Sequence, residues 1–157
     1  MSIFNIYTRI FIMIDKIDEE ILKLIAKNGR IKLNDLAKKV NLSISPCQAR
    51  LKKLEDKKYI LGYHARVNFE KLERAHIAFV QVVLSDTRAN ALENFNEEVS
   101  KLESIEQCHM IAGSFDYLLK VRTKNISQYR TILAEKISSL PNVASTSTFV
   151  SMETVKD

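Results

Sequence analysis

Residues 36–59, LAKKVNLSISPCQARLKKLEDKKY, decide the architecture of the first third of the chain. Two short amphipathic patterns flank a tight turn in this stretch, and the second pattern is strongly basic. Leu36, Ala37 and Val40 share one face of the first pattern. Asn41 follows and suits the left-handed conformation in which many helices end. The spacing therefore predicts two helices joined by a sharp turn, which is the helix-turn-helix arrangement.

The second helix of this pair has the clearest predicted start in the chain. Ser45 suits the N-cap, Pro46 suits the first helical position, and Gln48 completes an S-x-x-Q capping box. One narrow apolar stripe along this helix is made of Cys47, Leu51 and Leu54. The opposite face is short and polar near its start and becomes cationic one turn later. We therefore expect the stripe to be buried and the polar face to meet solvent or a partner.

A further helix and an extended segment are predicted on either side of this pair. Asp15 suits the N-cap of the first helix, because its side chain can accept a hydrogen bond from a free backbone N–H. The acidic residues that follow it lie near the positive end of the helix dipole. Asn28 and Gly29 end that helix. Tyr59–Asn68 is rich in Tyr, Ile and Val and contains Gly62. We interpret this segment as a wing strand, a hinge, or both.

Charge is divided unevenly along the 157 residues. Asp15–Arg66 contains 13 Lys or Arg against 7 Asp or Glu, whereas Val67–Asp157 contains 10 against 12. A basic first third joined to a mildly acidic remainder predicts that only the first third meets a polyanion, with double-stranded DNA as the expected partner.

The N-terminal stretch resembles a secretion signal only in part. Residues 3–14 are largely apolar, but Arg9 interrupts them, and neither a cationic start nor a small-residue cleavage site is present. We interpret residues 1–14 as a tail outside the folded domains, with Met13 as an alternative start. The two cysteines stand 61 positions apart and give neither a disulfide framework nor a metal spacing. We expect a cytoplasmic protein that does not enter a membrane.

From residue 75 the apolar periodicity changes to that of an α+β domain. The strands are predicted at 78–84, 105–112, 117–123 and 143–152, and the helices around 92–102 and 127–140. The order βαββαβ fits a ferredoxin-like sheet with both helices on one face. Both faces of the first strand are apolar, with Phe79 and Val83 opposite Val80. We expect the face without helices to pack against a second copy; the alternative is a long loop over a central strand.

The basic helix carries the residues from which we predict DNA recognition. A helix fits the major groove, and small or polar side chains near its start can reach base edges. The predicted base readers are Ser45, Gln48 and Ala49. The predicted phosphate contacts are Arg50, Lys52 and Lys53. Arg50 lies beside the buried stripe, so covering that stripe is an alternative role for it, and a solvated basic helix is the structural alternative for the whole face.

The turn between the two middle strands is a second candidate site. It consists of Gly113, Ser114, Phe115, Asp116 and Tyr117. As a plain hairpin turn, it would use a positive φ at the glycine and side-chain hydrogen bonds from the aspartate to nearby backbone. As a ligand loop, its backbone N–H groups would hold a carboxylate and Asp116 an ammonium group. Those are the two ends of an amino acid, and both interpretations stay open.

Neither catalytic machinery nor a cofactor motif is recognisable. Cys108 and His109 are neighbours on a predicted strand and therefore point to opposite faces, where they cannot act on one centre. The chain has no phosphate loop, Gly-rich fingerprint or nucleophile elbow. We predict no enzyme activity, no cofactor and no metal.

Several of these motifs, taken in order, resemble the Lrp/AsnC family of regulators, also called feast/famine proteins. The match covers about residues 14–156. Its most specific parts are Asn28-Gly29-Arg30-Ile31, Leu42-Ser43-x-Ser45-Pro46-Cys47, Tyr59-Ile60-x-Gly62-Tyr63, Cys108-His109-x-x-x-Gly113 and Phe115-Asp116-Tyr117.

The resemblance implies a winged helix-turn-helix at 15–60, a hinge strand and linker at 61–74, and an αβ sandwich at 75–157. It also implies a homodimer that assembles into an octamer, and amino-acid effectors such as leucine bound near residues 113–117. Ser114 stands where leucine-responsive relatives carry an acidic residue, which puts leucine as the effector in doubt. Two alternatives differ in class: an architectural DNA-bending protein with little ligand control, and a tetrapyrrole decarboxylase of similar fold.

Overall fold

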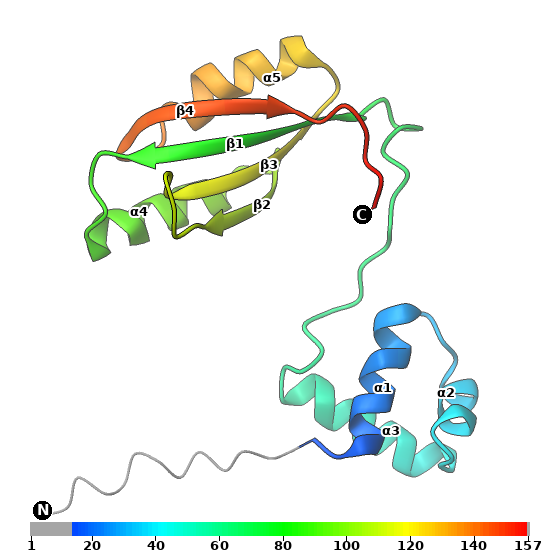
Figure 1. Cartoon of the computed structure of the whole chain (residues 1–157). Helices are drawn as coiled ribbons and strands as arrows, with labels where there is room; N and C mark the ends of the chain where they lie inside the picture. The colour runs from blue at the N-terminus through cyan, green and yellow to red at the C-terminus, as the bar shows by residue number, and fades with distance from the viewer. Residues whose placement is uncertain (1–13, 157) are drawn as a thin grey trace, which may run out of the picture. The chain divides into compact units, whose positions relative to one another are not determined.

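The computed structural model describes residues 14–156, so the predicted tail lies, apart from Ile14, outside the described residues. The chain divides into two compact units, Met1–Arg66 and Val67–Asp157 (Figure 1). No helix among the described residues combines the length and the apolar character needed to span a bilayer.

The first unit is a bundle of three helices. They are α1 (Lys16–Lys27), α2 (Leu33–Lys39) and α3 (Ile44–Asp56). Their shared core is built from Ile21, Leu36, Ala37, Val40, Cys47 and Leu54. These are the residues that the 3.6-residue periodicity places on the inward faces, so the predicted helix-turn-helix is confirmed.

Two predicted helix boundaries are confirmed in atomic detail. Asp15 is the N-cap of α1, and its Oδ1 accepts a hydrogen bond from the backbone N–H of Asp18 at 2.8 Å. Asn41, which follows α2, has φ 55° and therefore adopts the left-handed conformation expected for it. Together these two residues fix where α1 begins and where the turn to α3 starts.

The predicted start of α3 is wrong by two residues. Ser43, not Ser45, is the N-cap, and neither it nor a capping box forms a side-chain cap. Pro46 is the third helical residue instead of the first. It is tolerated there because the first N–H groups of a helix have no intrahelical partner to lose.

The segment that follows α3, interpreted above as a wing strand, a hinge, or both, forms no strand within one chain. The backbone N–H groups of Tyr59 and Ile60 still bond to the carbonyl of Leu54, but residues 61–68 are exposed and belong to no helix or strand. A strand needs a neighbouring strand to pair its N–H and C=O groups. The described part of this unit contains no strand, so a hinge is the interpretation that survives within one chain.

The second unit is a four-stranded antiparallel sheet with helices on one face (Figure 1). Along the chain its elements are β1 (His76–Leu84), α4 (Ala89–Ser100), β2 (Ile105–Met110), β3 (Tyr117–Thr123), α5 (Ile126–Ile132), the π-helical turn η1 (Leu133–Ile137) and β4 (Val143–Val150). The strand order β2-β3-β1-β4 and the βαββαβ order confirm the predicted ferredoxin-like arrangement.

The two faces of this sheet differ sharply. Val80 and Val82 of β1 are fully buried, in one core with Phe95 of α4 and Tyr129 of α5. On the opposite face Phe79, Gln81 and Val83 of β1 are only half-buried. We call this the open sheet face, and its apolar residues are Phe79, Val83, Leu118 and Phe149.

The open sheet face also carries charge, which the sequence pattern did not predict. Arg122, buried at the edge of β3, forms an ion pair with Glu106 and lies over the Phe69 ring at 4.3 Å from its centroid. Lys120 Nζ lies 3.6 Å from the same glutamate. Arg122 thereby holds the linker residue Phe69 against the second unit, which begins at Val67, before β1.

Candidate DNA interface and effector loop

The outward face of α3 matches the predicted DNA-reading surface. Cys47 and Leu54 are fully buried on the inner side of the helix. The predicted base readers Ser45, Gln48 and Ala49 are all exposed, and so is Lys52 one turn later. Such a helix can place the small or polar side chains near its start against base edges, and the lysine one turn later against phosphates.

Arg50, which is half-buried, pairs with two carboxylates at the start of α1. Its Nη1 is 2.6 Å from Asp15 Oδ2 and 2.8 Å from Asp18 Oδ1. Hydrogen bonds to Asp18 and then to Asp15 raise the pKa of the Arg50 guanidinium. The pKa of Asp15 is lowered, first by the N–H of Asp18 and then by Arg50. The structure therefore engages Arg50 in a tie between α1 and α3.

The two lysines of the predicted set differ in their surroundings. Lys53 Nζ is 3.7 Å from Asp18 Oδ2, and its side chain is 43% exposed. Lys52 is exposed on the outer side of α3. Because Lys53 shares Asp18 with Arg50, its charge is already partly balanced, whereas Lys52 faces solvent. Of the three predicted phosphate contacts, Lys52 is the best placed.

Sequence reasoning missed the role of Asp18 in this unit. Its side chain is 1% exposed, although aspartate is rarely buried without partners. The available signal was a second acidic residue three positions after the Asp15 N-cap, together with an arginine beside the α3 stripe. The pairing itself spans 32 residues, so no local pattern reveals it.

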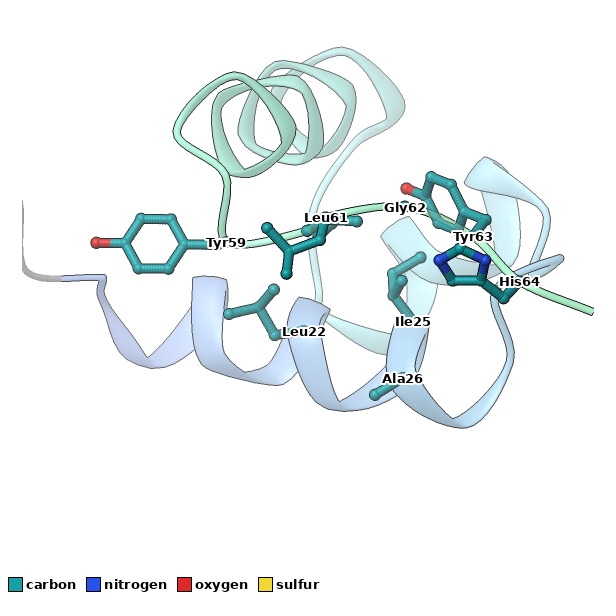
Figure 2. A pocket seen from close by; sticks show the side chains of 10 residues that line it. Leu22, Ile25, Ala26, Tyr59, Leu61, Gly62, Tyr63 and His64 are labelled. Atoms are coloured by element: carbon teal, nitrogen blue, oxygen red, sulfur yellow. The ribbon is translucent and has the colours of Figure 1, made fainter. Parts of the chain in front are cut away.

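A groove lies between α1 and the segment that follows α3 (Figure 2). It encloses about 270 Å³. Leu22, Ile25 and Ala26 of α1 line it, together with Gly29 in the turn after α1 and with Tyr59–His64 of the segment. Tyr63 OH donates a hydrogen bond to Glu55 Oε1 at 2.7 Å. Burial and then Glu55 raise the pKa of Tyr63 to about 12. A Cβ at Gly29 would lie 3.2 Å from the Tyr63 ring, so glycine permits this close approach.

The predicted effector loop is organised by Asp116. Its Oδ2 accepts a hydrogen bond from the backbone N–H of Leu84 at 2.7 Å. Its own N–H donates to the carbonyl of Val82, and its carbonyl accepts from the N–H of Ile111. The aspartate thus joins β1 to the hairpin of β2 and β3, over a longer range than the bonds to nearby backbone that the hairpin-turn interpretation gave it.

The remaining loop residues separate into exposed and buried ones. Gly113 and Ser114 are exposed, and Phe115 is half-buried. The positive φ that the hairpin-turn interpretation assigned to Gly113 does not occur, because none of the described glycines adopts one. Tyr117 packs in the core with its ring centroid 4.4 Å from that of Phe95, and burial raises the pKa of its phenol. Within one chain, only the first part of the loop is open to a ligand.

No group of three or more potential metal ligands occurs among residues 14–156. Cys108 and His109 pair with Leu119 and Leu118 on β3, so they point to opposite faces as predicted. Cys108 is exposed on β2 and Cys47 is buried in α3.

Both units of the chain match models of known protein families. A family model described as Lrp/AsnC ligand binding domain matches residues 77–157, and a model described as winged helix-turn-helix DNA-binding matches residues 14–60. The chain belongs to the Lrp/AsnC family. It is therefore a DNA-binding transcriptional regulator with an amino-acid-responsive domain.

Curated relatives and solved structures agree with this membership. The chain is 56% identical to a proline dehydrogenase transcriptional activator of Rhizobium radiobacter over 92% of each chain. It is 43% identical to the leucine-responsive regulatory protein of Klebsiella pneumoniae, over 91% of this chain and 87% of that one. A transcriptional regulator of Neisseria meningitidis solved with L-Met superposes with a TM-score of 0.84 at 28% identity, over 92% and 93% of the two chains.

These relatives are named as regulators, not as enzymes. The resemblance inferred from the sequence motifs is therefore confirmed, as is the predicted α+β fold with an N-terminal winged helix-turn-helix. Membership in this family favours ligand-controlled regulation over both the architectural alternative and the decarboxylase.

Proposed function

We propose that this Lrp/AsnC protein reads double-stranded DNA with the outward face of α3 and regulates a gene of proline degradation. One observation carries the DNA part: a polar and then cationic face is exposed on α3, while Cys47 and Leu54 of the opposite stripe are fully buried. The target is supported by the 56% identity to a proline dehydrogenase transcriptional activator, against 43% to a leucine-responsive protein.

Within this proposal the contacts are divided between specificity and affinity. Ser45, Gln48 and Ala49 read base edges, with Gln48 forming a bidentate pair with adenine. Lys52, assisted by Lys53, holds phosphates. The protein acts in the cytoplasm, where the DNA is.

The protein works as a homodimer that assembles further, to an octamer. The open sheet face supports the dimer, because Phe149 is 54% exposed and lies opposite Phe79 in the sheet register. An apolar face that the helices of its own chain leave uncovered favours burial against a second copy. Symmetric copies of α3 would then read two half-sites.

The effector is a small amino acid bound at the loop 113–117, and L-proline is the first candidate. The exposed N–H groups of Gly113 and Ser114 would hold its carboxylate. Oδ2 of Asp116 already accepts from Leu84, which leaves the other carboxylate oxygen for an ammonium group. Phe115 is half-buried and Tyr117 is buried, so both would anchor the loop in its own unit.

A binding experiment with two readouts tests the proposal. Fluorescence anisotropy measures the affinity of the full chain for DNA upstream of the proline dehydrogenase gene and for a scrambled duplex. Light scattering after size exclusion measures the assembly. Both are recorded with and without each of the twenty amino acids. We expect selective DNA binding that changes with L-proline. Equal affinity for both duplexes, or no response to any of the twenty amino acids, would contradict it.

A further inference from the structure

The buried carboxylate of Asp18 has no part in the functions proposed so far. It lies on α1, yet every charged group it meets on another element belongs to α3. Asp18 Oδ1 is 2.8 Å from Arg50 Nη1, and Asp18 Oδ2 is 3.7 Å from Lys53 Nζ. On its own helix, its backbone N–H is capped by Asp15, whose carboxylate lies 2.6 Å from the same Arg50 nitrogen.

A carboxylate as deeply buried as that of Asp18 is stable only when it is paired. Burying an ionised group is costly unless it is paired, and removing one partner of such a pair leaves the other unsatisfied. The Asp18 side chain is 1% exposed and that of Arg50 is 30% exposed, so the tie is shielded at one end and accessible to water at the other. The pair therefore holds its geometry more firmly than an ion pair on the surface would.

The apolar stripe of α3 is narrow, so it constrains rotation of the helix about its own axis only weakly. Cys47 and Leu54 are its two fully buried residues, and they stand almost in line along the helix. Arg50 lies to one side of that line and is anchored to α1. An attachment beside the Cys47–Leu54 line, as at Arg50, resists rotation of α3 about its axis. Ala49 and Lys53 are close to Arg50 on the helix surface.

We propose that Asp18, with Asp15, is a positioning residue for DNA reading: it fixes the rotation of α3 through Arg50, which contributes to sequence selection without contacting phosphate. This inference rests on the proposed function of α3. A base contact needs a donor and acceptor within about 2.7–3.2 Å, so a shift of about 1 Å at the helix surface is enough to lose it. Phosphate contacts made by long lysine side chains tolerate such a shift.

Salt dependence separates this role from a phosphate contact at Arg50. Each phosphate contact contributes about 0.9 to the slope of log K against log salt on duplex DNA. A positioning residue contributes nothing to that slope but lowers the affinity ratio between a specific site and a scrambled one. A role confined to stability changes neither quantity at a temperature where the variant is fully folded.

The experiment uses the full chain and a site selected from a random DNA library. Affinities for this site and for its scrambled version are measured over a salt series for wild type, Asp18→Asn, Arg50→Gln and the control Lys52→Gln. Circular dichroism sets a temperature at which all variants are folded. We expect Asp18→Asn and Arg50→Gln each to lower the specific-to-scrambled ratio about tenfold with an unchanged slope. Lys52→Gln lowers the slope by about 1 and keeps the ratio.

The double variant Asp18→Asn/Arg50→Gln provides a second test, in which neither partner is left as an unpaired buried charge. It replaces Asp18→Asn if that variant fails to fold, and we expect it to lose no more selectivity than Arg50→Gln alone, because both changes break one tie. A slope lowered by about 1 in Arg50→Gln, with the ratio kept, would overturn the inference. So would folded Asp18 variants with wild-type ratio and slope. A wild-type chain from which no preferred site can be selected would instead refute the proposed function.

Discussion

The helix-turn-helix unit and the C-terminal unit expose their candidate sites in different ways. On α3 the predicted readers project from a helix whose opposite side is buried, so the surface is already formed in one chain. In the effector loop, Asp116 is engaged by Leu84 and Tyr117 lies in the core. Within one chain, the candidate DNA surface is thus exposed along α3, whereas the candidate effector loop is exposed only at Gly113 and Ser114. We therefore expect DNA reading to depend on one element and the proposed effector binding to depend on assembly.

The largest expected effect tests whether the two units are independent. Leu54→Ala empties a fully buried position in the first unit, and Leu119→Ala does the same in the second. Each should lower the free energy of unfolding of its own unit by about 2 to 5 kcal/mol. Hydrogen exchange resolved by segment measures this. Loss of protection in both units from either substitution would show that they unfold together, contrary to the comparison.

A smaller effect is expected at the effector loop. Asp116→Ala removes the acceptor of the Leu84 N–H and should cost about 1.5 to 3 kcal/mol, in the range for hydrogen bonds to charged groups. Ser114→Ala, at an exposed position of the same loop, is the matched control and should stay within about 0.5 kcal/mol. Chemical denaturation of the full chain gives both values. An unchanged free energy in Asp116→Ala would mean that its carboxylate does not hold the loop.

The reading surface should respond at single base positions. Gln48→Ala should cost about 1 to 3 kcal/mol at the base pair that Gln48 contacts and little elsewhere in the site. Competition binding with a set of single-base variants of the selected site measures the profile. A flat profile in wild type as well as in the variant would remove Gln48 from the reading surface.

The phosphate contact at Lys52 should change salt dependence instead of preference. Lys52→Ala is expected to reduce the slope of log K against log salt by about 1 for every sequence tested. Lys57→Ala, also exposed but beyond the end of α3, serves as a control for general loss of charge. The prediction fails if the two substitutions lower the slope equally.

The smallest expected effect is on the stability of the first unit in acid. The folded-state pKa of Asp15 is lowered from its usual value near 3.8, so its contribution to stability is present above that value. It is lost as the pH falls through the lowered pKa of the folded protein. Asp15→Asn should therefore leave the first unit less sensitive to acid below about pH 4, and thermal unfolding as a function of pH measures this. A variant with the wild-type acid profile would show that Asp15 contributes nothing to the tie.

Much of the fold follows from local patterns. The buried sides of α2 and α3, the left-handed Asn41 and the limits of β3 all follow from periodicity and turn chemistry. The start of α3 does not, because Ser43 and Ser45 are both good caps and only the surrounding structure chooses between them.

The parts that sequence reasoning missed are long-range. The tie between Asp18 and Arg50 spans 32 residues, and the bond from Leu84 to Asp116 also spans 32. No helical or strand period connects positions so far apart. Local patterns also left the choice between a wing strand and a hinge open for residues 61–68, because a strand there would need a pairing strand that the described part of their unit does not contain.

One measurement tests the central claim most directly: base-by-base binding profiles of Gln48→Ala and Lys52→Ala, recorded against the same set of site variants over the same salt series. The account predicts that the two substitutions diverge. Gln48→Ala should relax the preference at one position with an unchanged salt slope, and Lys52→Ala should weaken all sequences with a slope lower by about 1. Equal effects of both substitutions on all sequences would contradict the assignment of DNA reading to the outward face of α3.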